Sequence, residues 1–104
     1  MKKARREAAR ERLEELLSSH PPTQGMYVRT WGDHLIIGRH EPFGPDGEIE
    51  ADDRLRLTVL NHSSFGLSVR RHTGRWEQTP FTGTLDELVD IIGSLMQHIV
   101  APYT

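Results

Sequence analysis

The sequence predicts an α+β fold: an N-terminal helix, a five-stranded, meander-like antiparallel sheet, and a C-terminal helix packed on one face of that sheet. Apolar residues recur with helical spacing at both ends of the chain, whereas in the middle they alternate with a period of two. Glycine, proline and asparagine divide the middle into short runs. The 104 residues suffice for one compact domain, with residues 1–20 as an amphipathic helix that has a basic start and 21–104 as the sheet and last helix.

The first helix is predicted over residues 3–19, which contain neither glycine nor proline and are rich in Ala, Arg, Glu and Leu. Its apolar stripe is narrow and begins only at Ala9. We therefore expect the first two turns to project from the domain, to fray, or to rest on a partner. Pro21 and Pro22 end the helix, because proline cannot continue the hydrogen-bond ladder.

A first hairpin is predicted around Gly32-Asp33, between strands 26–31 and 34–39. Glycine at the first central position suits a type II′ turn, so Val28 should pair with Ile37 and Arg29 with Ile36. A run of glycine and proline at residues 42–47 leads into the acidic residues 46–53, which are expected to form a loop with a short edge strand around Ile49.

The clearest strand is residues 54–60, where leucine and valine alternate with polar side chains. A three-residue turn leads into strand 65–71, and its odd length keeps the apolar side chains of both strands on one face. A two-residue turn at Thr73-Gly74 would then set Arg70 opposite Glu77 and Ser68 opposite Thr79.

The last helix is predicted to begin after Thr84, because Thr84 and Glu87 have the spacing of a capping box. Its apolar stripe is wide and contains Leu85, Leu88, Val89, Ile91, Ile92, Leu95, Met96 and Ile99. This is more apolar surface than one sheet face usually covers. Either the first helix packs beside it in the same chain, or a second subunit does. Pro102 stops the helix.

Charge is separated along the chain. Residues 2–12 hold six cations and two acids, whereas residues 41–53 hold six acids and no cation. These two segments are expected to be solvated, to pair with each other, or to face different partners. The formal net charge of -2 argues against a protein that binds polyanions over its whole surface.

The predicted partner-binding site is the sheet face turned away from the helices. If the leucines of strand 54–60 are buried, that face gathers Tyr27, Arg29, Trp31, Arg54, Arg56 and Arg70. Arginines among aromatic rings can hold phosphates and stack bases, yet the same residue types are enriched at protein interfaces. They also occur on ordinary solvent-exposed strands, where the aliphatic part of arginine side chains packs on apolar surface. All three interpretations remain open.

No catalytic centre, cofactor or metal site is predicted. The chain has no cysteine, which excludes disulfides and thiolate chemistry, and its histidines lack zinc-binding spacing. The acidic segment lacks the glycine and closing glutamate of an EF-hand calcium loop. His62 lies beside Ser63, but a turn explains both, and the sequence has no nucleophile elbow or phosphate loop.

The preferred hypothesis is a small cytoplasmic, non-catalytic interaction module. No apolar run is long enough to span a membrane, and charged residues follow Met1, so no membrane partner is expected. We expect a homodimer or another protein partner, bound through the arginine and aromatic sheet face or the wide apolar face of the last helix. The alternative is a nucleic-acid-binding accessory protein that uses the same sheet face and the basic first helix.

Overall fold

The computed structural model describes residues 2–103 and confirms the predicted order of a helix, a five-stranded antiparallel sheet and C-terminal helices. Neighbouring strands follow one another along the chain, so the sheet is a meander. The helical elements are α1 (Lys3–Ser18), the 3-10 turn η1 (Pro21–Thr23), α2 (Leu85–Leu95) and α3 (Gln97–Val100). The strands are β1 (Tyr27–Trp31), β2 (His34–Phe43), β3 (Glu48–Val59), β4 (Phe65–Arg70) and β5 (Trp76–Gly83).

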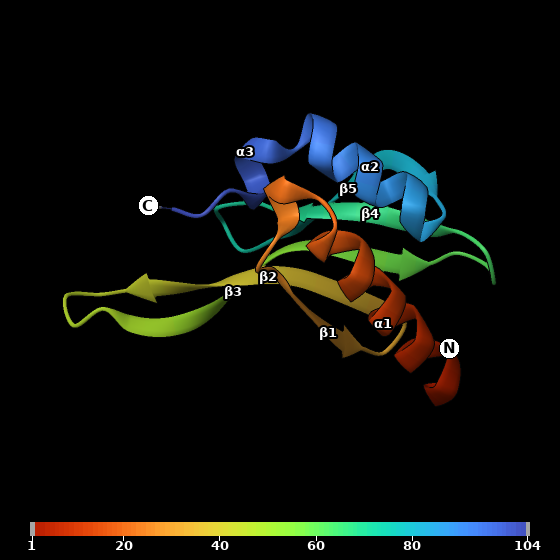
Figure 1. Ribbon diagram of the computed structural model, residues 1–104, viewed down its shortest axis with the longest axis horizontal. Coiled ribbons are helices and arrows are strands. Elements are labelled where there is room, and N and C mark those ends of the chain that lie inside the picture. The colour runs from red at the N-terminus through yellow and green to blue at the C-terminus, as the bar shows by residue number, and fades with distance from the viewer. Residues whose placement is uncertain (1, 104) are drawn as a thin grey trace.

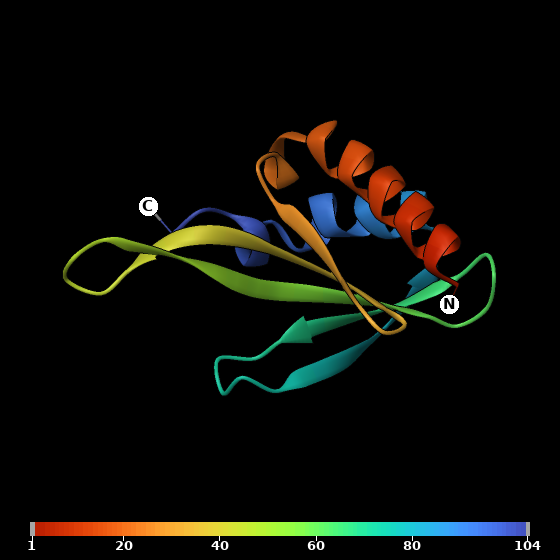
Figure 2. The same ribbon diagram turned by 90° about the horizontal axis from the view of Figure 1, so that it is seen from below.

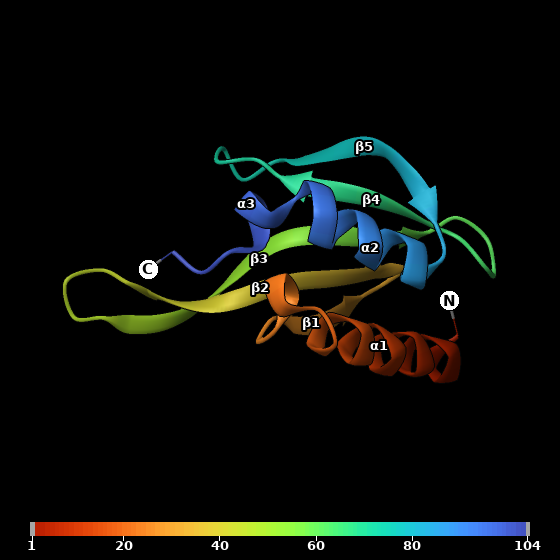
Figure 3. The same cartoon turned by 45° about the horizontal axis from the view of Figure 1, so that its top comes forward.

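The helices α1 and α2 lie side by side on one face of the sheet (Figures 1 and 3). The core between them is built from leucine, isoleucine and valine of both layers, including the fully buried Leu13, Leu17, Leu57, Leu67, Leu88 and Ile92. Within residues 2–103, no helix covers the opposite face, which we call the outer face (Figure 2). No helix in this range is long and apolar enough to cross a lipid bilayer.

The first helix docks on its own chain. Leu13 and Leu17 are buried in the core, and the basic start of α1 rests on two turns of the sheet. The Arg5 guanidinium donates to the carbonyl of Asn61 at 3.2 Å, and that of Arg6 to the carbonyl of Gly32 at 3.4 Å. The first turns of α1 therefore contact their own domain.

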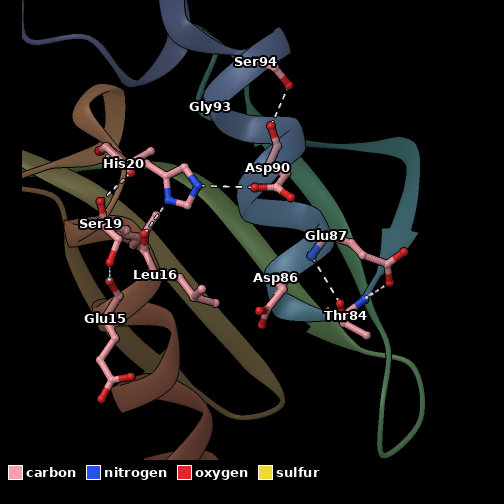
Figure 4. Close-up of polar contacts among 12 residues, drawn as sticks. Glu15, Leu16, Ser19, His20, Thr84, Asp86, Glu87, Asp90, Gly93 and Ser94 are labelled. Carbon is pink, nitrogen blue, oxygen red and sulfur yellow. Dashed lines mark hydrogen bonds and ion pairs between the residues drawn. The ribbon is translucent and has the colours of Figure 1, made fainter.

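The end of α1 is joined to α2 by His20 (Figure 4). Its Nδ1 lies 2.8 Å from the carbonyl oxygen of Leu16, and its Nε2 lies 3.3 Å from the carboxylate of Asp90 on α2. The His20 ring is also the nearest neighbour of Gly93, where a Cβ would lie 4.0 Å away in ordinary contact. The structure therefore gives no steric reason for the glycine.

The helix α2 begins with the predicted capping box. The Glu87 amide donates to Thr84 Oγ1 at 3.2 Å, and the Thr84 amide donates to the Glu87 carboxylate at 3.0 Å (Figure 4). The predicted single helix is interrupted at Met96, whose backbone leaves the helical region, and α3 follows. Most of the apolar stripe of α2 is covered by the sheet and α1, although Leu95 is 60% exposed.

Two of the three predicted hairpin registers are confirmed. Val28 pairs with Ile37 across β1 and β2, and Leu57 pairs with Leu67 across β3 and β4. The register predicted for β4 and β5 is wrong by one residue, since Arg70 pairs with Trp76 rather than Glu77. The turn closes between Arg71 and Arg75 and contains a left-handed glycine at Gly74, which is typical of a three-residue hairpin loop.

The prediction of a loop over residues 46–53 is wrong from Glu48 onward, where the short strand expected around Ile49 is part of the long strand β3. β2 and β3 stay paired as far as Phe43 and Glu48, and the chain turns between Gly44 and Gly47. β1 pairs with β2 only up to Gly38, and β4 pairs with β3 only up to Leu55. Residues 38–53 therefore extend past the other strands as a two-stranded ribbon, which we call the β2–β3 arm (Figure 1).

Candidate functional site

An irregularity where the β2–β3 arm joins the sheet decides which arginines reach the outer face. Ile37 pairs with Leu55, but Gly38 pairs with Asp53, so β3 contains one extra residue, Arg54. Such a bulge changes the alternation of side chains along a strand. Arg56 keeps its predicted place on the outer face, whereas Arg54 turns toward the helices with Leu55. The predicted placement of Arg54 on the outer face is wrong.

The buried Arg54 anchors the C-terminal segment of the chain. Only 4% of it is exposed, and its Nη1 donates to the carbonyls of Ile99 and Ala101 at 3.2 and 2.7 Å. Its Nη2 donates to the buried Glu41 carboxylate at 3.0 Å. The guanidinium also lies 4.1 Å from the centre of the Tyr103 ring. Arg54 is therefore a structural residue below α3 rather than a contact for a partner.

A second buried arginine, Arg39, supports the same segment. Its Nε donates to the carbonyl of Val100 at 2.5 Å, and its Nη1 and Nη2 donate to the carbonyls of Gln24 and Pro22 at 2.7 and 3.1 Å. Burial lowers the pKa of the Arg39 guanidinium, and the nearby charge of Arg54 adds to this effect. The sequence contained a signal for this position, since Arg39 and Glu41 continue the inward alternation of Leu35 and Ile37.

On the outer face, Asp53 of β3 joins side chains from β1 and β4. Tyr27 Oη donates to its carboxylate at 2.5 Å, and Arg29 donates through Nη2 at 2.6 Å and Nε at 3.2 Å. Arg70 Nη1 lies 3.9 Å away. Tyr27, Arg29 and Arg70 are therefore brought together as predicted, but around an acid that neutralises much of their charge.

The protonation of this cluster follows from its contacts. Burial opposes ionisation of the Asp53 carboxyl, but hydrogen bonds from Arg29 and Tyr27 outweigh it and hold the pKa below its ordinary value of 3.8. Burial, together with the hydrogen bond to Asp53, raises the pKa of the Tyr27 hydroxyl well above its ordinary value. At neutral pH the cluster therefore contains a carboxylate, a neutral phenol and charged guanidinium groups.

The pKa of Asp53 predicts a pH dependence of stability. Because its folded-state pKa is depressed, ionised Asp53 stabilises the fold above pH 3.8, and this contribution is lost as the pH falls through the folded-state value. We expect the wild type to be more stable than Asp53→Asn at pH 7, and the difference to shrink below pH 3.8. Urea unfolding of both proteins from pH 7 to pH 2 tests this. A difference independent of pH would contradict the assigned role.

Arg56 differs from the other arginines of the outer face. Its guanidinium stacks over the Trp76 ring at 4.9 Å. Within residues 2–103, no carboxylate or hydrogen-bond acceptor contacts it, and its Nε is buried without a partner. Beside it on the same face, Ile36 is 0% exposed although no helix covers it, so the long neighbouring side chains shield it. In the described residues, the centre of the outer face is thus a buried isoleucine beneath a guanidinium that has no ion pair.

Trp31 gives this face its most exposed aromatic ring, and the half-buried Trp76 lies on the same face. Trp31 lies at the end of β1, is 61% exposed, and has its ring 6.0 Å from that of His34. Trp76 was not among the predicted site residues, because a turn one residue shorter would place it on the other face. The three-residue turn sets it opposite Arg70 and beside Arg56.

Two arginines near the basic start of α1 pair with acids of α1 and α2. Arg10 of α1 pairs with Glu7 and Glu14, and Arg12 pairs with Glu15 and with Asp86 of α2. No contact joins the basic start of α1 to the acidic β2–β3 arm in the described part of the chain. Residues 2–103 contain no group of three or more potential ligands that could hold a metal ion.

Comparisons with protein-family models, with curated proteins and with solved structures give no match for this chain. The function is therefore inferred from the geometry of the outer face and of the β2–β3 arm.

Proposed function

We propose that the protein is a non-catalytic, cytoplasmic interaction module that self-associates or binds another protein through its outer face. The observation that supports this most directly is Arg56, which stacks on Trp76 and lacks an acceptor within residues 2–103. A partner carboxylate at this point would complete its hydrogen bonding. Trp31, which is 61% exposed, supplies aromatic contact area of the kind found at interfaces.

The face favours a protein partner over a nucleic acid because little of its positive charge is free. Binding to a polyanion releases counterions in proportion to the phosphates that are neutralised, and so requires several uncompensated cations. Here Arg29 and Arg70 already face Asp53. The wide apolar surface predicted for the last helix supports the proposal less, since α1 and the sheet cover most of it.

A nucleic-acid role is the second candidate, and one observation favours it. Arg6 at the basic start of α1 contacts the β1–β2 turn next to the exposed Trp31, so cations and an aromatic ring meet at one end of the outer face. In complexes of proteins with single-stranded nucleic acid, exposed aromatic side chains beside cations stack on unpaired bases.

Charge reversal at Arg56 tests the proposal. We expect the wild type to form a concentration-dependent dimer in sedimentation velocity, and Arg56→Glu to weaken it by about tenfold or more, as for a central interface arginine. Arg75→Glu makes the same charge change at the exposed β4–β5 turn and should leave the dimer intact.

Two results would contradict self-association through this face. One is a wild type that stays monomeric at high micromolar concentration, and the other is an equal response to both variants. Binding of a fluorescent oligonucleotide that falls steeply with salt and is lost in Arg56→Glu would support the nucleic-acid candidate instead.

A further inference from the structure

The β2–β3 arm has an unpaired strand edge. β4 ends its pairing with β3 at Val69 opposite Leu55, and the chain then turns back at Arg71 into the β4–β5 hairpin. In residues 2–103, Glu48 to Asp53 pair only with β2. At about 3.4 Å per residue, these six residues give roughly 20 Å of edge with outward-facing backbone groups.

The space beside this edge is hollow. A pocket of about 590 Å³ lies against β3 where a longer β4 would have continued. Its walls include Glu50 and Asp52 on β3, Arg70 and His72 at the end of β4, and Tyr103 from the C-terminal segment. One further strand placed in line with β4 would occupy this pocket.

The edge is held in position before any partner arrives. Asp52 accepts hydrogen bonds from Arg54 Nε at 3.0 Å and from Tyr103 Oη at 2.6 Å, and Asp53 is fixed by Tyr27 and Arg29. A strand that binds here therefore meets a preorganised edge, which reduces the entropy lost on binding.

The negative charge of the arm determines which kind of strand can pair with its free edge. Asp46, Glu48 and Glu50 are exposed, and no cation pairs with them in the part of the chain that the structure describes. Two copies of this edge would place like charges opposite each other, which is a recognised defence against edge-to-edge pairing. A segment that bears lysine or arginine would instead be attracted to these three acids, since Asp52 and Asp53 are already paired with arginines.

We propose that the free β3 edge of the arm accepts an extended, Lys- or Arg-rich segment of a partner protein as a sixth strand. Backbone hydrogen bonds to Glu48–Asp53 would hold the segment, and the carboxylates at the edge would select its charge. This surface is separate from Arg56 and Trp76 on the outer face, so the two proposals can fail independently.

A pair of synthetic peptides tests this proposal with the full chain. The first is a fluorescent hexapeptide of alternating lysine and valine, and the second has proline in place of each valine, which keeps the charge but removes backbone donors. We expect the first to bind at least about tenfold more tightly, because the second loses several backbone hydrogen bonds. Amide NMR signals of residues 48–53 should shift and exchange more slowly when the first peptide is bound.

Matched variants test the charge selection. Glu50→Lys should weaken binding of the lysine-valine peptide about fivefold, whereas Glu11→Lys, the same change on the exposed surface of α1, should not. Arg56→Glu should bind the peptide like the wild type. Equal binding of both peptides, shifts confined to other residues, or no binding at low salt would each overturn the proposal.

Discussion

Arg54→Met is expected to lower the free energy of unfolding by about 3–5 kcal/mol, since it leaves the Glu41 carboxylate buried without its cation. Both side chains of this ion pair are about 95% buried, at 4% and 5% exposure, and their charged atoms lie 3.0 Å apart. The variant also removes the donor that holds the carbonyls of Ile99 and Ala101 below α3. Urea unfolding, followed by circular dichroism, measures the loss.

Two further variants separate the buried charge from other effects. Arg56→Met, two residues away on the outer face, should change stability by less than about 1 kcal/mol, because Arg56 is without an ion pair in residues 2–103. Adding Glu41→Leu to Arg54→Met should recover part of the loss, because it removes the uncompensated buried carboxylate. Equal losses in Arg54→Met and Arg56→Met would contradict the inward placement of Arg54.

Gly38→Ala is expected to destabilise the protein by about 2–3 kcal/mol, as for overpacking of a fixed site. A Cβ at this position would overlap the carbonyl oxygen of Asp52 and would lie 2.6 Å from Tyr27 Cζ. The Tyr27 ring crosses over Gly38 on its way to Asp53, so the added methyl group would also disturb that hydrogen bond. The measurement is urea unfolding at pH 7.

Gly66→Ala is the matched control for Gly38→Ala. Gly66 lies in β4, and its Cβ would meet Leu60 at 3.7 Å in ordinary contact. We expect this variant to change stability by less than about 1 kcal/mol. A Gly38→Ala protein as stable as Gly66→Ala would show that the backbone at the bulge is free to move, and would contradict the tight approach of Tyr27.

Much of the fold is predictable from local sequence because neighbouring residues determine it. Gly32-Asp33 sets the register of the first hairpin, the odd turn before Phe65 keeps the leucines on one face, and Thr84 with Glu87 begins α2. Each feature depends on turn or cap chemistry within a few residues.

The β2–β3 arm could not be predicted from the same patterns, because its stabilising contacts come from distant parts of the chain. The carboxylates of residues 48–53 have low strand propensity. Two of them are held by residues far away in sequence, Asp53 by Tyr27 and Asp52 by Tyr103. Tertiary contacts of this kind override the local preference for a loop.

The sheet face on which the candidate site residues lie was predicted correctly except where one extra residue in a strand or turn changes the alternation of side chains. Tyr27, Arg29, Trp31, Arg56 and Arg70 occupy the outer face as expected. The bulge beside Gly38 turned Arg54 inward, and the longer β4–β5 turn brought Trp76 to the face. Neither the bulge nor the length of this turn can be recognised from the alternation of apolar and polar residues along the sequence. Whether a partner binds these residues remains a proposal.

The bulge sends Arg54 beneath α3 and leaves Arg56 on the outer face. Side-chain nuclear Overhauser effects in the unmodified protein test this most directly. We expect the side-chain protons of Arg54 to show contacts with the Tyr103 ring and with residues 99–101, and those of Arg56 to show contacts with the Trp76 ring. Contacts of both arginines with Trp76, or of Arg54 with Tyr27, would contradict the account.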